Sequence, residues 1–194
     1  MLRSVRSLLP LLSVLVLSAL GCSEKHDPSA RTAAPLVKEA TVTWPVAAAV
    51  DEAALRRFSA EGRTRIGKTP LPVLAPAEPL DDLVFVGEDA FYSVNGHRDA
   101  TLPSGEISRL TVTVHAARRL YAHDEIPADV PTVPLRKTRG LSTVNEDIVT
   151  VTWIEGGVAY SVDAECSNVA DARCQGDGYV RALTDALVFV GGAR

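Results

Sequence analysis

The sequence predicts an α+β domain in which an N-terminal and a C-terminal helix pack on an antiparallel sheet. Apolar residues at every second position indicate strands in the middle of the chain, and helix-spaced apolar residues stand at both ends of the domain. The chain has 194 residues, of which 46% are hydrophobic and 23% charged, which is typical of one globular domain. Its net charge is −4 and its basic residues form no long run, so we expect no nucleic-acid partner.

The N-terminus has the layout of a secretory signal. Arg3 and Arg6 precede an apolar run over 8–20 that is too short to span a bilayer, and a small residue follows. The stretch ALGC at 19–22 resembles the lipobox of bacterial lipoproteins, in which the cysteine is diacylated on sulfur and becomes the mature N-terminus. The resemblance implies lipidation of Cys22 and a membrane partner through this anchor. A plain secretory signal, with an incidental thiol, is the alternative.

Three regions follow from this signal. Residues 1–21 are predicted to be a lipoprotein signal peptide, 22–50 the lipidated cysteine and a flexible tether, and 51–194 a single α+β domain. The tether is rich in Pro and Ala and has no lasting periodicity. Ser23 follows the cysteine, so the resemblance implies the cell envelope, at the outer membrane if the host is Gram-negative. Trp44 is expected to pack back onto the domain rather than to serve as a binding hook.

Residues 62–69, GRTRIGKT, match the phosphate-binding loop G-x-x-x-x-G-K-S/T. A working loop needs a strand before it and a helix that begins at its Lys and Thr. Here the apolar spacing over 51–66 predicts a helix before the motif, with Asp51 at its start and Gly62 at its end. The proline residues of the following stretch, 70–79, exclude a helix after it. We therefore expect no nucleotide to bind.

Alternating patterns begin after this proline-rich stretch. Residues 83–86 and 91–94 are predicted strands separated by a break or bulge. Asn95-Gly96 and the PSG at 103–105 are competing signals for the next tight turn. In RLTVTVHA, 109–116, the apolar residues share one face and the Thr and His residues the other. This pattern predicts a half-buried antiparallel strand.

Residues 147–166 predict a β-hairpin with a two-residue turn at Gly156, because only an even turn keeps both apolar sets on one face. The expected cover of this face is a helix over 179–190 that ends at Gly191-Gly192. The sequence LVFVG at 187–191 also occurs at 83–87, and we interpret the match as coincidence, in a helix and a strand. The residues expected to meet are Val149, Val151, Trp153, Val158, Tyr160, Val162 and Ala164 of the hairpin and Tyr179, Leu183, Leu187 and Val190 of the helix.

Cys166 and Cys174 remain as an even pair once lipidation has used Cys22. Export favours a disulfide between them, which would tie the hairpin to the final helix across the loop SNVADAR. A metal-binding pair would need further Cys or His ligands nearby, and a pair of free thiols is disfavoured by export. These two remain as alternatives.

Candidate catalytic and metal-binding residues are few. The patterns G-x-S-x-G and H-E-x-x-H, paired C-x-x-C motifs and an EF-hand loop are absent from the sequence. The segment 122–140 is predicted to be a long loop, a kind of segment in which function often lies. We predict no catalytic residue, metal ligand or cofactor, and we interpret the nearest candidates as ordinary solvated side chains. These candidates are His123, Asp124 and Glu125 of the loop, His97 and His115 for a dispersed site, and Asp163, Glu165, Asp171 and Asp177 for a weak cation site.

The segment 150–192 resembles the closing W…G…Y…C…C…helix…GG pattern of small uncharacterised bacterial lipoproteins. It also looks loosely like the strand-strand-helix end of some extracytoplasmic anti-sigma-type domains. The resemblance implies fold and location, and it carries no catalytic residue. We expect an envelope-anchored lipoprotein with a non-catalytic domain that binds an envelope protein or a small ligand. The alternative is a hydrolase with a dispersed active site near 122–140.

Overall fold

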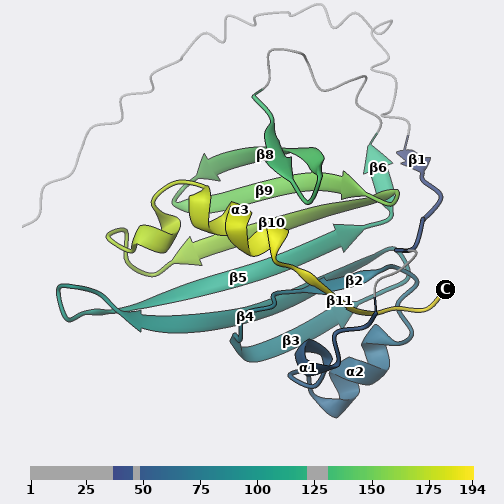
Figure 1. The fold of residues 1–194 in the computed structure, drawn as a ribbon, viewed down its shortest axis with the longest axis horizontal. Coiled ribbons are helices and arrows are strands. Elements are labelled where there is room, and N and C mark those ends of the chain that lie inside the picture. Colours follow the sequence, from purple (N-terminus) through teal and green to yellow (C-terminus); the bar gives the residue numbers. More distant parts are fainter. Residues whose placement is uncertain (1–36, 46–48, 122–130) are drawn as a thin grey trace, which may run out of the picture. The chain divides into compact units, whose positions relative to one another are not determined.

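Seven antiparallel strands form the main sheet of the computed structural model (Figure 1). The structure describes residues 37–45, 49–121 and 131–194. The antiparallel sheet and the α+β class are as predicted. Across the sheet the strands lie in the order β3 (Asp81–Gly87), β4 (Phe91–Thr101), β5 (Ile107–Ala117), β10 (Val158–Cys166), β9 (Ile148–Glu155), β8 (Thr138–Asn145) and β7 (Val133–Leu135).

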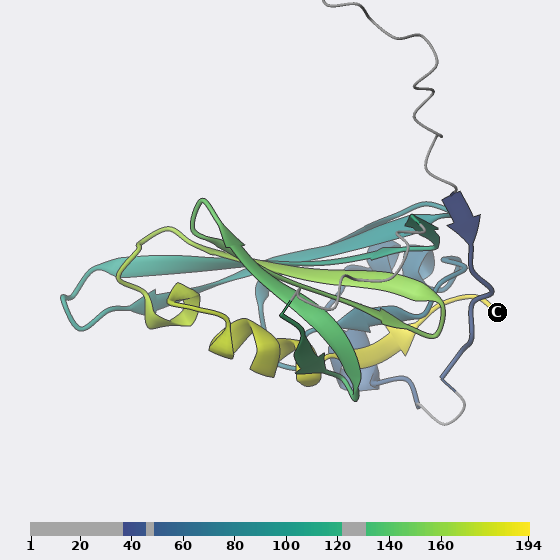
Figure 2. The same cartoon turned by 90° about the horizontal axis from the view of Figure 1, so that it is seen from above.

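Smaller elements flank this sheet. Two short sheets pair β1 (Val37–Glu39) with β6 (Arg119–Tyr121), and β2 (Val73–Ala75) with β11 (Val188–Gly191). The helices are α1 (Glu52–Leu55), α2 (Ala60–Ile66) and α3 (Gly178–Asp185), with a short 3-10 turn, η1 (Ala172–Cys174). Contacts join α1 to β11, α2 to β3, and α3 to β9 and β10. Figure 2 shows α3 and β11 on the same side of the main sheet.

One face of the main sheet is buried because apolar side chains alternate along its central strands. The predicted apolar positions of the hairpin are all buried. Trp153 and Tyr160 are cross-strand partners and stack with their ring centroids 5.1 Å apart. The Tyr160 hydroxyl donates to the carbonyl of Pro72, which lies just before β2. This face therefore forms the core, as the alternation predicts.

The predicted N-terminal helix is divided in two. The carboxylate of Asp51 accepts from the Ala54 amide and caps α1, while the Ser59 hydroxyl accepts from the Gly62 amide and caps α2. The second cap starts a new helix where the sequence suggests one continuous helix. Gly62 lies inside α2, so the prediction that it ends the helix is wrong.

The turn after β4 decides between the two turn positions that the sequence offers, and the turn before β4 replaces the predicted break or bulge. The turn after β4 is at PSG, where Gly105 has φ 87°. Asn95 and Gly96 continue β4 instead of turning, and a Cβ at Gly96 would come within 2.9 Å of the Leu80 Cβ. The break after β3 is itself a tight turn, because the Glu88 amide donates to the Phe91 carbonyl over 2.9 Å. Close approach to Leu80 therefore explains the glycine in β4.

The C-terminal helix is shorter than predicted. It ends at Asp185, and the residues that follow pair with β2 as strand β11. Arg136 contributes to this ending because its Nη1 donates to the carbonyls of Leu187, at 2.7 Å, and Thr184, at 3.3 Å. The first copy of LVFVG therefore lies in β3, and the second copy, after Leu187, forms β11. The apolar spacing of Leu187 and Val190 reflects burial in the core rather than a helix.

Residues 131–140 correct the predicted long loop. They include β7 and the start of β8, joined by a tight turn at Arg136 and Lys137 with positive φ angles of 45° and 67°. Two consecutive residues of this kind are typical of the hairpin turn whose twist matches the flanking strands. The rest of the predicted loop, 122–130, lies outside the described residues.

Part of the predicted tether belongs to the folded unit. Strand β1 pairs with β6, and the Thr43 amide donates to the Gly156 carbonyl in the turn between β9 and β10. The Trp44 ring meets Phe189 edge-on at 6.4 Å, as expected for a side chain that packs back onto the domain. The tether interpretation therefore does not hold for 37–45.

Candidate functional site

The second face of the main sheet carries a mixture of polar and apolar side chains, and it is named the outer face here. Its residues alternate with the core residues along each strand, so they follow from the same period-two pattern. Strand register places them in rows across the sheet. One row contains Ser93, His115, Ser161 and Thr152, and the next contains Asn95, Thr113, Asp163 and Thr150.

A hydrogen-bonded polar network runs through these rows. Nε2 of His115 lies 3.4 Å from Oδ2 of Asp163, and the Thr150 hydroxyl donates to Oδ1 of the same carboxylate over 2.7 Å. The interaction with His115 lowers the pKa of Asp163, the Thr150 hydroxyl adds to this, and partial burial opposes both. Asp163 therefore stays ionised and orients the imidazole. In the same row as Asp163, the Thr113 hydroxyl donates to Oδ1 of Asn95 over 2.6 Å.

Beside this network the outer face is hollowed by a pocket of about 560 Å³. Its shape follows from one row of the sheet, in which Phe91, Ala117, Ala159 and Ile154 lie side by side on neighbouring strands. The two central residues of this row are alanines and the two outer ones are large. The alanines therefore form the floor of the pocket, and the side chains of Phe91 and Ile154 rise above it at either end. The volume is within the range of small-molecule sites in proteins, roughly 300 to 1,000 Å³. This row and the pocket above it are named the hollow.

Arg139 carries the permanent charge in the described lining of the hollow. Among the described lining residues, the ionisable side chains of the outer face are His115 and Arg139, and neither Asp nor Glu contributes. Arg139 is held in place because its Nε and Nη2 donate to the Thr132 hydroxyl over 3.1 Å and 2.8 Å. The remaining outer-face lining residues are Leu141, Thr152 and Ser161.

A smaller cavity of about 210 Å³ lies beside α3. The Tyr179 hydroxyl donates there to the carboxylate of Glu78, which also pairs with Arg98 over 3.3 Å. Burial and the neighbouring Glu78 raise the pKa of Tyr179 well above its usual range. These polar groups satisfy one another and the cavity is small, so the hollow is the better candidate site.

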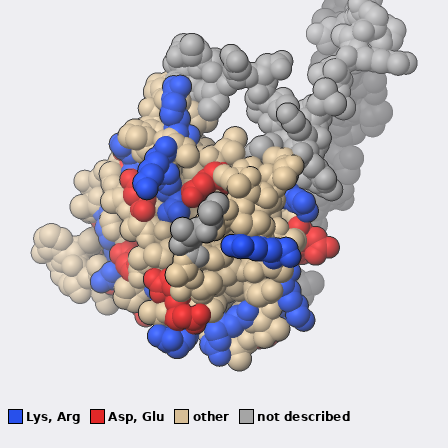
Figure 3. Space-filling view, turned by 45° about the vertical axis from the view of Figure 1, so that its right-hand side comes forward, with Lys and Arg blue, Asp and Glu red and all other residues tan. Residues whose placement is uncertain are grey.

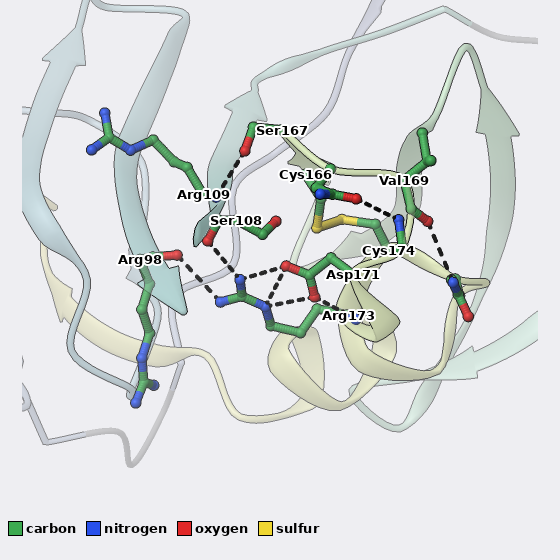
Figure 4. The surroundings of a disulfide bond; sticks show 12 residues. Arg98, Ser108, Arg109, Cys166, Ser167, Val169, Asp171, Arg173 and Cys174 are labelled. Carbon is green, nitrogen blue, oxygen red and sulfur yellow. Dashed lines mark hydrogen bonds and ion pairs between the residues drawn. A yellow bond between two sulfur atoms is a disulfide. The ribbon is translucent and has the colours of Figure 1, made fainter. Parts of the chain in front are cut away.

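The predicted cysteine pair is joined by a disulfide with an S–S distance of 2.06 Å (Figure 4). Cys166 ends β10 and Cys174 lies in η1, just before α3. The bridge therefore ties the sheet to the segment that leads into the final helix, as expected. Closing so short a loop is expected to stabilise the fold by about 2.5 kcal/mol.

Of the dispersed candidates from the sequence, His115 and Asp163 come into contact, while His97, Asp171 and Asp177 lie in separate pairs. His97 lies on β4 with its Nδ1 4.0 Å from Oδ2 of Asp82, whereas His115 pairs with Asp163. Of the acidic residues considered for a weak cation site, Asp163 faces His115, Asp171 pairs with Arg173, and Asp177 approaches Arg181. Within 37–45, 49–121 and 131–194, no three His, Cys, Asp or Glu side chains gather as a metal site would require. Cys22, His123, Asp124 and Glu125 lie outside the described residues.

The phosphate-loop motif has the context that the sequence predicts. Its first residues lie in α2, which ends at Ile66 with Gly67 as its C-cap, and the chain then passes to β2 without forming a helix. The Thr69 hydroxyl donates to the Arg65 carbonyl over 3.0 Å and the residue is buried. Its hydroxyl is therefore engaged in ending the helix.

On the face in Figure 3, basic and acidic side chains lie interspersed among uncharged ones. That the protein has no nucleic-acid partner stays a prediction. In the part of the chain that the structure describes, no helix is both long and apolar enough to cross a membrane.

Together these features define a disulfide-bonded α+β domain whose antiparallel sheet has a buried face and an outer face with an apolar hollow. No family model, curated protein or solved structure matches the chain.

Apart from His115, the lining residues of the hollow are not among the candidates that the sequence suggests. Ala117 and Ala159 are 42 positions apart and become neighbours only through the register of β5 and β10. Arg139 stands in the segment that was expected to be a loop. The only signal in the sequence was the alternation that puts Ala117 and Ile154 opposite the core face.

Proposed function

We propose that this protein is a lipid-anchored protein of the cell envelope whose domain binds a small apolar ligand in the hollow. The observation that carries the proposal is the row of two alanines between Phe91 and Ile154, which leaves about 560 Å³ open on the outer face. Apolar lining with a few polar groups at the margin is typical of ligand sites. In this account α1, α2 and α3 cover the opposite face and leave the outer face to the ligand.

The anchor would keep this site close to the membrane. Fourteen residues separate Cys22 from β1. Even fully extended, they span at most about 50 Å. A ligand that partitions into the membrane or is released from it would then meet the hollow at high local concentration. An apolar binding site and a lipid anchor would therefore both serve the binding of a membrane-derived ligand.

The His115–Asp163 pair is the single observation that favours the alternative, a hydrolase. An imidazole oriented by a carboxylate is half of a nucleophile-activating arrangement. The other half is a hydroxyl or thiol in contact with the imidazole. In the described part of the chain, no Ser or Thr hydroxyl is hydrogen-bonded to His115. Binding is therefore the function that the geometry supports better.

Filling the hollow tests this proposal. The change Ala159→Phe is expected to weaken binding of the neutral dye N-phenyl-1-naphthylamine at least tenfold, because the new ring would occupy the space between Phe91 and Ile154. Tenfold corresponds to about 1.4 kcal/mol of binding free energy. Fluorescence titration of the full chain with Cys22→Ala measures it without competition from acyl groups.

A matched control is Thr143→Phe, which adds the same ring on the exposed part of β8 outside the hollow. This variant should bind the dye as the parent chain does. Equal affinity of the parent chain and Ala159→Phe would show that the dye does not enter the hollow and would contradict the proposal.

A further inference from the structure

The charge of the hollow differs from that of the chain. The protein has a net charge of −4, yet the ionisable outer-face residues of the described lining are Arg139 and His115. A carboxylate in the lining would repel an anionic ligand. A cationic side chain attracts such a ligand even when the side chain is partly exposed. The electrostatics of the hollow therefore favour a negatively charged ligand.

Arg139 stands at one end of the apolar row. Gly140 pairs with Trp153, so the preceding residue, Arg139, lies next to Ile154. The row thus runs from Phe91 on β4 over the two alanines to Ile154 on β9, and then meets a guanidinium on β8. Four strand spacings of about 4.8 Å separate Phe91 from Arg139, a distance of about 19 Å. A narrow apolar row of this length suits an extended alkyl chain.

The guanidinium is positioned for a head group. Two of its nitrogens, Nε and Nη2, donate to one oxygen, the Thr132 hydroxyl, which restrains the side chain. An arginine restrained in this way loses less side-chain entropy when it binds an anion. Guanidinium also matches the planar geometry of a carboxylate better than an ammonium group does.

We infer that the ligand of the hollow is an anionic amphiphile, with its alkyl chain across Ala117 and Ala159 and its carboxylate at Arg139. This inference rests on the proposed function, because it assigns the ligand class of the same site. The His115 imidazole lies in the adjacent row, where Asp163 occupies its Nε2. Arg139 is therefore the group that selects the head group.

Three probes with the same chain and different head groups test the inference: dodecanoate, dodecanol and dodecyltrimethylammonium, each below its micelle concentration. Binding is measured by displacement of N-phenyl-1-naphthylamine from the full chain with Cys22→Ala. Dodecanoate is expected to bind three- to tenfold more tightly than dodecanol, in keeping with roughly 1 kcal/mol for a partly exposed charge pair. The ammonium probe is expected to bind most weakly.

Arg139→Gln should abolish the preference for dodecanoate over dodecanol, while thermal unfolding shows that the variant is folded. Arg56→Gln removes the same charge from an exposed position at the end of α1 and should keep the preference. Equal binding of dodecanoate and dodecanol by the parent chain, or a preference that survives Arg139→Gln, would overturn the anionic-amphiphile inference and leave the hollow as an apolar site. If none of the three probes displaced the dye, the proposed function would fail with it.

Discussion

Asp171→Asn is expected to lower the free energy of unfolding by about 3 kcal/mol at neutral pH. Asp171 lies in the loop closed by the disulfide, and its side chain is only 4% exposed. Its carboxylate receives the Arg173 guanidinium over 2.6 Å and the Arg173 amide over 3.0 Å. Loss of one partner from a buried ion pair leaves an uncompensated charge, which costs about 3 to 5 kcal/mol. The lower end applies because the Arg173 side chain keeps 17% exposure.

The same guanidinium connects the loop to the sheet. Arg173 donates to the carbonyls of Arg98 on β4 and Ser108 on β5, each over 3.2 Å (Figure 4). Asn retains the size of Asp171 but loses its charge, so these contacts are expected to loosen as well. Chemical denaturation of the oxidised protein measures the change. A loss below about 0.5 kcal/mol would show that the ion pair contributes nothing measurable.

The effect of Asp171→Asn should depend on pH in one direction. The Arg173 guanidinium holds the pKa of Asp171 well below its ordinary value of about 3.9. A carboxyl group with a depressed pKa in the folded state stabilises the fold above its unfolded pKa, and this contribution is lost as the pH falls toward the folded value. The difference between parent and variant should therefore be complete above about pH 5 and shrink below pH 4.

Cys22→Ala is expected to abolish labelling by an alkyne analogue of palmitate and to move the protein from the membrane fraction to the soluble fraction. The reason is physical, since each buried methylene of an acyl chain contributes about 0.8 kcal/mol to membrane binding and no other anchor is proposed. Cys174→Ser is the matched control, because it removes a different cysteine and should leave the labelling intact. Equal labelling of the parent and Cys22→Ala would contradict the lipoprotein proposal.

The features that were predicted correctly depend on residues that are close together in the sequence. The hairpin of β9 and β10 follows from strict alternation and from two glycines at its turn, Gly156 and Gly157, both with positive φ. The disulfide could also be inferred, because its cysteines are close in the sequence and stand at the end of a strand and before a helix.

The features that were predicted wrongly or not at all depend on contacts between residues that are far apart in the sequence. Leu187 and Val190 have helical spacing relative to Leu183, but β2 offers hydrogen bonds to the chain after Asp185, and β11 forms instead. Arg136 is 51 positions from Leu187, whose carbonyl it binds, so no local window contains both. The same reasoning applies to the hollow, whose floor requires the register between β5 and β10.

The location of a bound amphiphile tests the central claim most directly. Amide chemical shifts of the ¹⁵N-labelled chain with Cys22→Ala can be followed during titration with dodecanoate. We predict that the largest changes cluster at Ala117, Ile154 and Ala159, with smaller changes along α3. Largest changes in α3 around Tyr179, or no saturable change at any residue, would contradict a binding site in the hollow of the outer face.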